Sequence, residues 1–393
     1  MPTETKPCIC IFSALYSPAV GGVETYTGNL ARAIADLGYR VIIVTSNTHD
    51  AAPRENDGTI EIVRLPCRPL LGGRYPVPRA DRSFKELWSW LGQQQIDYII
   101  VNTRFYLLSN RGLRFSRERG ITPILIEHGS AHLTMGNPLI DKGVAFVEHA
   151  LTSIGKRYRA SYWAVSAKSS AWLKHFGIAS QGELSNSIDA DAYCAQASKR
   201  SYKDELGLSA SDFVVAFVGR LVPEKGVKEL AQASRLLEDR TDISFIVAGD
   251  GPLSEAASQQ ASSRMHLLGR LDPPDIAALL AQSDILCLPS RSEGFATSLL
   301  EAAACCTTAV ATEVGGGREL MPDEAYGTII PNAEPQTIAD AIRRAADHPG
   351  QTADKGRLLG KLVRTDYSWE KTARRAISAC ERAQREAAGE ATE

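Results

Sequence analysis

The order of hydrophobic and polar positions along the chain predicts a series of strands that alternate with helices. In the first half, five short apolar runs are typical of strands, and a loop with Pro18, Gly21 and Gly22 follows the first of them. Apolar residues then recur at helical spacing up to Gly38. Strands that alternate with helices form parallel sheets covered on both faces, so we predict a Rossmann-like domain. The predicted strands are residues 8–12, 41–45, 60–65, 98–101 and 123–126.

The second half of the chain shows the same alternation. Apolar periodicity lapses over residues 186–203 and then resumes. This predicts a second Rossmann-like domain and an α/β fold with two parallel sheets that face each other across a cleft, because ligands bind at the carboxyl ends of parallel strands. The predicted strands are residues 213–218, 243–247, 285–288 and 309–311, and helices are expected at about 227–237, before Arg264 and from Thr297.

Composition places the chain among soluble globular proteins. Its 393 residues suggest two or three domains, and 44% hydrophobic and 23% charged residues are typical of a protein with a large core. No run of about 18 apolar residues occurs, and the first residues lack an apolar segment, so we expect a cytoplasmic protein. The eight cysteines form no CxxC pair, and we expect them to be reduced, without a zinc site.

The net charge of −2 hides a difference between the two halves. Residues 1–200 contain 23 lysines and arginines against 17 aspartates and glutamates, whereas the remainder contains 21 against 29. An anionic acceptor or the anionic inner face of a membrane would suit this basic half; a solvated arginine-rich face is the alternative, and no nucleic-acid partner is expected. Most of the excess is Arg68, Arg74, Arg79, Arg82, Lys85, Arg104, Arg111, Arg114, Arg117 and Arg119.

Two carboxylates, Glu293 and Glu301, are separated by seven residues directly after an apolar run. The segment is typical of a strand, a glycine-containing loop and a helix, which presents backbone N–H groups to an anion such as phosphate. Carboxylates are good acceptors for hydroxyl groups. The pair therefore suggests a sugar and a ribose on either side of a diphosphate, although two ordinary glutamates at a helix start would give the same pattern.

A second motif is the strand end followed by Arg220 and Lys225. A lysine at a helix start opposes the helix dipole, so it is expected to have an anionic partner. Arginine binds phosphate oxygens in a bidentate manner and lysine acts as a point charge, which together suit a diphosphate. Three further glycine-rich loops follow apolar runs, although each alone is more often a turn: Gly21-Gly22, residues 249–253 and residues 315–320.

In their order these motifs resemble the retaining nucleotide-sugar glycosyltransferases of the GT-B fold, family 4 (glycosyl transferases group 1). The matching segments are the Gly21-Gly22 loop and residues 218–226, 248–253, 292–301 and 315–319. The match is dense from about 210 to 330 and sparse before. The resemblance implies an acceptor-binding domain, residues 1–190, completed by the C-terminal helix at about 368–393 after a return through Trp369. The donor-binding domain would be residues 200–367.

The resemblance also implies a role for each residue of the site. Arg220 and Lys225 would bind the donor diphosphate, and Glu301 would accept hydrogen bonds from the ribose. Glu293 would orient the sugar. The other donor-binding residues would be Gly294, Phe295, Ala296 and Thr297 at the sugar, Gly269 and Arg270 at the base, and Gly21 and Gly22 at the phosphates.

His128 ends a predicted strand of the first half and matches the histidine-containing loop of the family. It would support the transferred sugar or position the acceptor hydroxyl; a loop or core histidine is the alternative. His132 makes a superficial metal pair with His128, which we discount because the intervening glycine indicates a loop. No metal ligand is expected, and the catalytic residues would be Glu293, His128, Arg220 and Lys225.

Three other segments bear on the domain organisation. Asp189 and Asp191 resemble a metal-binding D-x-D motif, but they follow a segment that matches the hinge of the family, where Ser187 replaces the usual glycine. Cys305-Cys306 stands where a glycine and a proline are common.

The predicted helix 144–158 carries an apolar stripe with a basic end, which is more typical of core packing but would also suit docking on a bilayer. The stripe is Val147, Leu151, Ile154 and Tyr158.

These features predict a retaining glycosyltransferase that moves a sugar from a nucleoside-diphosphate donor, with UDP or GDP as the expected base, to a hydroxyl of a glycan or lipid-linked glycan. The leaving phosphate would take the acceptor proton on the same face of the sugar, without metal or other cofactor. A nucleotide-sugar epimerase of the same fold and a catalytically silent nucleotide-sugar-binding protein are the alternatives.

Overall fold

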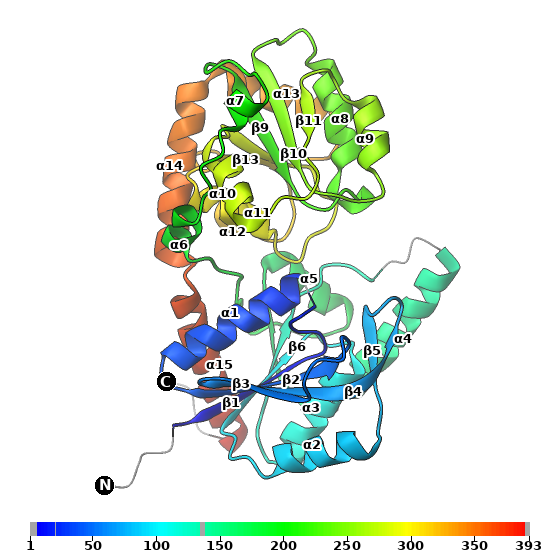
Figure 1. The fold of residues 1–393 in the computed structure, drawn as a ribbon. Coiled ribbons are helices and arrows are strands. Elements are labelled where there is room, and N and C mark those ends of the chain that lie inside the picture. The colour runs from blue at the N-terminus through cyan, green and yellow to red at the C-terminus, as the bar shows by residue number, and fades with distance from the viewer. Residues whose placement is uncertain (1–5, 20, 134–137, 390–393) are drawn as a thin grey trace. The chain divides into compact units, whose positions relative to one another are not determined.

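The computed structural model describes residues 6–19, 21–133 and 138–389. Contacts group the chain into two compact units (Figure 1). The first comprises Met1–Asn186 and Trp369–Glu393, and the second comprises Ser187–Ser368. The boundary lies within the segment where the apolar periodicity lapses, beside Ser187.

The first unit is built on a mixed sheet with strand order β3-β4-β2-β1-β6-β7-β8, and β5 pairs with β4. The neighbours from β4 to β8 are parallel, whereas β3 and β5 each pair antiparallel with β4. The strands are β1 (Cys8–Ser13), β2 (Arg40–Asn47), β3 (Arg54–Asp57), β4 (Ile60–Leu70), β5 (Tyr75–Pro78), β6 (Tyr98–Asn102), β7 (Ile124–Glu127) and β8 (Ser161–Ala164).

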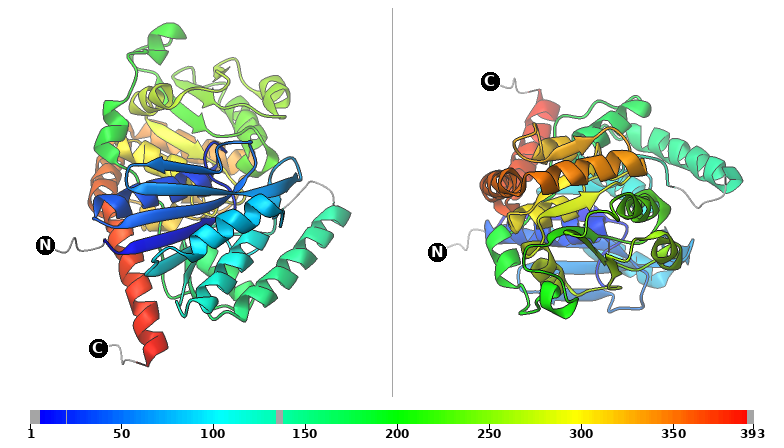
Figure 2. Two further views of the ribbon diagram at one scale, coloured as in Figure 1. Left: turned by 60° about the horizontal axis from the view of Figure 1, so that its bottom comes forward. Right: turned by 90° about the horizontal axis from the view of Figure 1, so that it is seen from above.

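Helices cover the first sheet, and one of them comes from the end of the chain. The final helix, α15, contacts α1, β6 and β7, and Figure 2 shows it in red beside the strands of this unit. Its Thr372 hydroxyl donates to the Ser185 carbonyl at 3.3 Å. The helices are α1 (Gly22–Asp36), α2 (Arg82–Gly92), α3 (Leu107–Glu118), α4 (Pro138–Lys156), α5 (Ala167–His175) and α15 (Trp369–Ala388).

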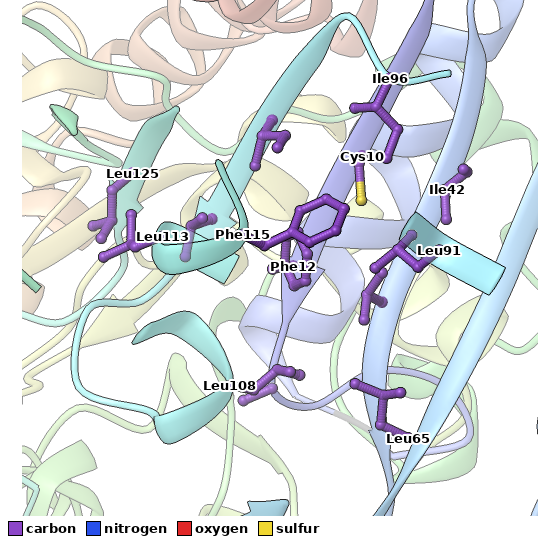
Figure 3. Packing of buried hydrophobic residues seen from close by; sticks show 14 of the residues in the cluster. Cys10, Phe12, Ile42, Leu65, Leu91, Ile96, Leu108, Leu113, Phe115 and Leu125 are labelled. Carbon is purple, nitrogen blue, oxygen red and sulfur yellow. The ribbon is translucent and has the colours of Figure 1, made fainter. Parts of the chain in front are cut away.

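The core of the first unit lies between the sheet and α2 and α3. Phe12 of β1 packs against Trp88 and Phe115, with ring centroids 6.2 and 5.9 Å apart. Figure 3 shows Phe12 and Phe115 with Leu91 and Ile42 around them. Burial of such side chains stabilises the fold by about 1.5–3 kcal/mol each. The alternating pattern therefore positions the loops that follow β1, β6 and β7 at one edge of the sheet.

The second unit contains an all-parallel sheet with strand order β11-β10-β9-β12-β13-β14. Its strands are almost wholly buried because helices lie on both faces, as the continuous apolar runs predict. The strands are β9 (Phe213–Val218), β10 (Ile243–Ala248), β11 (Met265–Leu267), β12 (Ile285–Leu288), β13 (Thr308–Thr312) and β14 (Thr328–Ile330).

The helices of the second unit include the two that follow the predicted phosphate loops, α8 and α11. All of them are short except the last two, which close the unit before the chain returns at Trp369. The helices are α6 (Ala190–Ala195), α7 (Tyr202–Glu205), the 3₁₀ turn η1 (Pro223–Lys225), α8 (Val227–Leu236), α9 (Ser254–Gln260), α10 (Pro273–Ala281), α11 (Thr297–Ala304), α12 (Gly317–Leu320), α13 (Pro335–Asp347) and α14 (Pro349–Asp366).

The predicted fold class, with two parallel sheets, is confirmed; the antiparallel strands of the first unit were not predicted. All four residues of β3 are exposed, so no apolar alternation marks them, and the turn at Gly58 that joins β3 to β4 was not recognised. None of the described helices is long and apolar enough to cross a membrane.

Candidate active site

Lys225 and Glu293 form an ion pair in the second unit. Lys225 is the last residue of η1 and is separated from α8 by Gly226, and Glu293 lies in the loop between β12 and α11. The Lys225 and Glu293 side chains are 21% and 13% exposed. The anionic partner expected for a lysine at a helix start is thus a carboxylate of the protein itself. A phosphate that binds Lys225 would compete with this pair.

Arg220 lies at the start of the same loop and is exposed. No ion pair or hydrogen bond of its side chain is among those of the described residues. Arg270 is likewise exposed, two strands away in the order of the sheet, after β11. Gly269, beside it, adopts φ +71° and accepts a 2.8 Å hydrogen bond from the N–H of Gly249. These two arginines are therefore available to a ligand at the carboxyl edge of the sheet.

The glycine-rich loops of the second unit pack backbone against backbone at this edge. A Cβ at Gly249 would overlap the carbonyl of Gly219, and one at Gly315 would overlap the carbonyl of Gly294. The N–H of Gly315 donates to the carbonyl of Glu293 at 3.2 Å, and that of Ala296 donates to Gly315 at 2.9 Å. Glycine is required here because any side chain would separate the loops. The contacts hold the backbone around Glu293 in place.

Helix α11 begins beside Glu293. Its N-cap, Ala296, has no polar side chain that could accept from the N–H groups of the first turn. Thr297 is exposed at this end. Phe295 is 8% exposed and packs against Tyr367 at 6.4 Å, so its ring belongs to the support of the loop. The helix start can therefore receive an anion, and Glu293 stands beside it.

Glu301 lies about one turn into α11 and is partly buried. Burial raises the pKa of its carboxyl to about 7, and the nearby Lys225 ammonium lowers it by a smaller amount. A carboxylate with such a pKa changes its ability to accept hydrogen bonds near neutral pH. Lys225 thus acts on both glutamates of the motif, by contact with Glu293 and through space on Glu301.

In the first unit, Gly21 is the N-cap of α1 and Gly22 its first residue. They follow β1 at the carboxyl edge of the first sheet, as predicted. Gly21 is extended, with φ −177°, and Glu24 folds back so that its carboxylate occupies the space that a Cβ of Gly21 would take. Burial raises the pKa of Glu24. This start of α1 is therefore already faced by one carboxyl group of the protein.

His128 follows β7 and is held by a polar network. Its Nε2 lies 3.1 Å from Oδ1 of Asn102, whose amide nitrogen donates to the Thr27 hydroxyl at 2.8 Å. Because Oδ1 can only accept, Nε2 carries the proton and Nδ1 keeps a lone pair. Tyr26 packs its ring edge-to-face on the imidazole at 4.7 Å. Burial lowers the pKa of His128 to about 3, so the imidazole is neutral.

Asn102 and Tyr26 are functional candidates that sequence reasoning missed. Tyr26 is buried, donates to the Leu184 carbonyl at 3.0 Å and packs on Trp369 of α15 at 5.4 Å. The signal for Asn102 was its place at the end of β6, beside β7, because neighbouring parallel strands end at one edge. The contact of Tyr26 with Trp369 joins residues far apart in the sequence, and no local pattern indicates it.

The interpretation of residues 64–119 as a largely unpaired basic surface is wrong for several of them. Arg104 is buried and pairs with Glu127 and Glu148. Arg119 donates to carbonyls of residues 91, 92 and 94. Three more pair with nearby acids: Arg79 with Asp81, Arg82 with Glu86 and Arg114 with Glu118. The basic side chains of this set with no ion pair among the described residues are Arg68, Arg74, Lys85, Arg111, Arg117 and Arg119.

Asp189 and Asp191 both have structural partners. Asp189 caps α6 by accepting from the Ala192 N–H at 3.0 Å, and Asp191 pairs with Arg364 at 2.9 Å.

All eight cysteines are free. His132 does not pair with His128 but lies with His149 and His175.

The apolar stripe predicted for residues 144–158 lies largely on α4, and only part of it belongs to the core. Leu151 is 9% exposed, whereas Val147 and Ile154 are 47% and 41% exposed. The core interpretation is therefore wrong for these two positions. Nearer the start of the same helix, Leu139, Ile140 and Phe146 are also exposed. A face of α4 thus presents large apolar side chains.

Two family models match the chain. The model "Glycosyltransferase Family 4" matches residues 20–213, and "Glycosyl transferases group 1" matches residues 198–357. A D-inositol 3-phosphate glycosyltransferase from Arthrobacter sp. (strain FB24) is 26% identical over 382 residues, which span 90% of this chain and 88% of that protein. The two models together reach from the glycine loop of the first unit to α14 of the second.

Solved structures show the same fold. Sucrose-phosphate synthase from Thermosynechococcus elongatus matches with a TM-score of 0.75 and 20% identity, over 96% of this chain and 99% of that one. Anabaena Alr3699/HepE in complex with UDP and glucose matches with a TM-score of 0.69 and 20% identity, over 96% and 100%. With the glycine loops, the glutamate pair and both family models, these matches show that the chain belongs to family 4 of the glycosyltransferases, with the GT-B fold.

Proposed function

We propose that this glycosyltransferase transfers a sugar from a nucleoside-diphosphate donor, with UDP or GDP as the base, and retains the anomeric configuration. The observation that carries the proposal is the ion pair of Lys225 with Glu293 beside the start of α11, with Arg220 exposed nearby. Cations and a helix N-terminus suit a diphosphate, and the carboxylates suit hydroxyl groups. The complex of Anabaena Alr3699/HepE with UDP and glucose supports a nucleotide-sugar donor.

Donor binding would exchange the partners of Lys225. The diphosphate takes the ammonium group of Lys225 and the guanidinium of Arg220, and Glu293 is released to accept hydrogen bonds from sugar hydroxyls. Because the Lys225–Glu293 pair already holds both side chains in place, little ordering is needed when the donor binds. Glu301 then accepts from the ribose, and Gly269 and Arg270 adjoin the base.

The transfer step breaks the bond between the anomeric carbon and the phosphate oxygen and forms a bond from that carbon to the acceptor oxygen on the same face. The proton of the acceptor hydroxyl passes to the departing phosphate oxygen. Arg220, Lys225 and the α11 N-terminus stabilise the negative charge that develops there. For the first unit, we propose that the neutral His128 offers its Nδ1 lone pair to a hydroxyl and that the Gly21-Gly22 turn binds phosphate.

We propose an anionic acceptor, in a lipid-linked glycan or glycolipid. The basic side chains without ion pairs among the described residues, such as Arg68 and Arg74 near the β4–β5 turn, favour this class. The Arthrobacter relative is named for an acceptor with a phosphate group, D-inositol 3-phosphate. The protein would meet this acceptor at a bilayer surface. The apolar face of α4 would contact the bilayer, together with Lys142 on the same helix and Arg157 directly after it.

The donor and the reaction class are tested together. The protein is incubated with UDP- and GDP-sugars, with and without glycolipid acceptors, and product and donor are examined by NMR. An α-linked product from an α-linked donor supports the proposal. An inverted linkage rejects retention, isomerised donor without acceptor identifies an epimerase, and donor binding without any turnover across the acceptors identifies a silent sensor.

Membrane contact is tested with Phe146→Ser, because Phe146 is 75% exposed on α4. The variant should no longer sediment with vesicles that contain phosphatidylglycerol, and its melting temperature should equal that of the wild type. Leu358→Ser is the matched control, since Leu358 is an exposed apolar residue of α14 in the second unit. Equal sedimentation of the wild type with pure phosphatidylcholine would reject the anionic preference, and unchanged binding of Phe146→Ser would reject the α4 face.

A further inference from the structure

Three histidines of the first unit meet at its surface, away from the network of His128. His132 lies in the loop after β7, His149 is on α4, and His175 is the last residue of α5. Their ring centroids are 5.4 Å apart for His132 with each of the other two, and 5.1 Å apart for His149 with His175. One ring nitrogen of each lies within 4.8 Å of the others. Three separate elements thus supply three nitrogen ligands to one point.

The closest pair already has the spacing of two ligands on one metal ion. Nε2 of His149 and Nε2 of His175 are 3.3 Å apart. Zinc–nitrogen bonds of about 2.0–2.1 Å in a tetrahedron place two nitrogens about 3.3–3.4 Å apart. The same distance also fits a hydrogen bond in which one imidazole donates to the other. The spacing alone therefore leaves two readings, which the surroundings of His132 help to separate.

His132 is oriented as metal-bound histidines usually are. Its Nδ1 lies 2.6 Å from Oε2 of Glu148. A carboxylate that accepts the N–H of one ring nitrogen fixes the tautomer and leaves a lone pair on the other nitrogen. Glu148 is itself held by the buried Arg104, which also pairs with Glu127. The carboxylate that supports His132 is therefore fixed by the core of the unit.

The charge around the cluster favours a cation. The buried side chains of Arg104, Glu127 and Glu148 together carry a net charge of −1 when ionised. Burial of unbalanced charge is costly, so a positive charge next to Glu148 is stabilising. A metal ion bound to neutral imidazoles supplies it, and so does a proton on His132. These two sources make different predictions for zinc titration.

Aromatic rings hold the histidine side chains in place. The indole of Trp172 stacks on His175 with ring centroids 4.9 Å apart and an angle of 5° between planes, and it meets His132 edge-on at 4.7 Å. Phe176 contacts His149 at 4.7 Å. His149 and His175 are exposed. A metal ion therefore has preoriented ligands and can reach them from solvent.

We propose that His132, His149 and His175 bind one divalent transition-metal ion of the zinc class, with water in the fourth position. The ion joins α4 and α5 to the loop that also carries His128. It stabilises the first unit and takes no part in the proposed transfer step.

The test uses untagged full-length protein, freed of metal by a chelator and titrated with Zn²⁺ by calorimetry. One ion should bind per chain, and His149→Gln and His175→Gln should each weaken binding by at least about 10-fold. His49→Gln is the matched control, because His49 is exposed in the same unit, outside the cluster, and contacts Thr48. Zn²⁺ should also raise the melting temperature of the wild type and of the control, but not of His175→Gln.

Cobalt substitution identifies the ligands independently. The Co²⁺ form should show the intense visible bands of a four-coordinate site without thiolate charge-transfer absorption. Absence of zinc binding in the wild type, equal binding by His175→Gln, or a thiolate spectrum would each overturn the proposal. A melting temperature that rises on acidification of the metal-free wild type and is insensitive to Zn²⁺ would assign the cluster to a protonated His132 instead.

Discussion

The ammonium group of Lys225 contacts the carboxylate of Glu293, the first acid of the glutamate pair. The two residues come from loops after different strands, β9 and β12, which are neighbours in the sheet. Lys225 also acts through space on Glu301. One cation therefore connects the residues proposed to bind phosphate, sugar and ribose, and its replacement should affect all three.

Lys225→Ala should lower kcat/KM by about 10²–10³-fold, because one charged contact to the leaving phosphate is lost. The substitution also leaves Glu293 without the Lys225 ion pair, so Lys225→Gln, which can still donate a hydrogen bond, is the better-folded comparison. Steady-state kinetics and thermal melts of both variants measure this. Near-normal kcat/KM in either folded variant would remove Lys225 from the phosphate site.

Arg220→Ala should lower kcat/KM to a similar extent with no change in melting temperature, because the exposed side chain has no ion pair or hydrogen bond among the described residues. Arg357→Ala is the control, since Arg357 is an exposed arginine of α14 that pairs with Asp354. The two variants should differ in kcat/KM and have the same melting temperature. Equal activity of Arg220→Ala and the control would contradict the assignment.

Glu301→Gln should abolish a pH dependence of nucleotide binding. The pKa of the Glu301 carboxyl is raised to about 7, so the group takes up a proton as pH falls below 7 and becomes a poorer acceptor for ribose hydroxyls. UDP or GDP affinity of the wild type should therefore rise between pH 6 and 8. Calorimetry at three pH values measures it, and a parallel rise in the glutamine variant would assign the pH dependence to another group.

Glu301 should also affect stability with a definite sign. A carboxyl whose folded pKa lies above its ordinary value favours the folded state at low pH and loses this contribution as pH rises towards 7. Glu301→Gln should therefore gain in melting temperature relative to the wild type between pH 5 and pH 8. A gain that is the same at both pH values would show that burial does not raise this pKa.

His128 should contribute acid sensitivity. Its folded pKa is lowered to about 3 from an ordinary value near 6.5, so the unfolded chain binds the proton first. The associated stability is present above pH 6.5 and is lost as pH falls towards 4. His128→Gln, which keeps a donor for Asn102, should lose less melting temperature over this range and should lower kcat. An identical pH profile of melting in both proteins would contradict a neutral, buried His128.

Much of the fold followed from apolar periodicity, because the strands of both sheets are buried runs bounded by glycine-rich loops. The sequence predicted the loops of Arg220, Lys225 and Glu293 because strand ends and glycines fix their backbone, and it predicted the helix that carries Glu301. It did not predict that Lys225 and Glu293 pair, since that contact joins residues of different loops. β3 was missed because its residues are exposed and polar.

The histidine cluster shows the limit of reading sequence locally. His132 was compared with His128, four residues away, whereas its neighbours in space, His149 and His175, belong to two later helices. Burial of Arg104 was missed for the same reason, because its acidic partners Glu127 and Glu148 follow far along the chain. Long-range pairs depend on the topology of the sheet, which periodicity alone does not give.

The central claim, a nucleotide-sugar site built around Lys225, is tested most directly by a thermal-shift panel of UDP-, GDP- and ADP-sugars on the wild type and Lys225→Gln. A ligand at 100 times its dissociation constant should stabilise the protein by about 2.7 kcal/mol. The account predicts a clear shift with a UDP- or GDP-sugar that is lost in the variant. No shift with any donor, or an equal shift in both proteins, would contradict it.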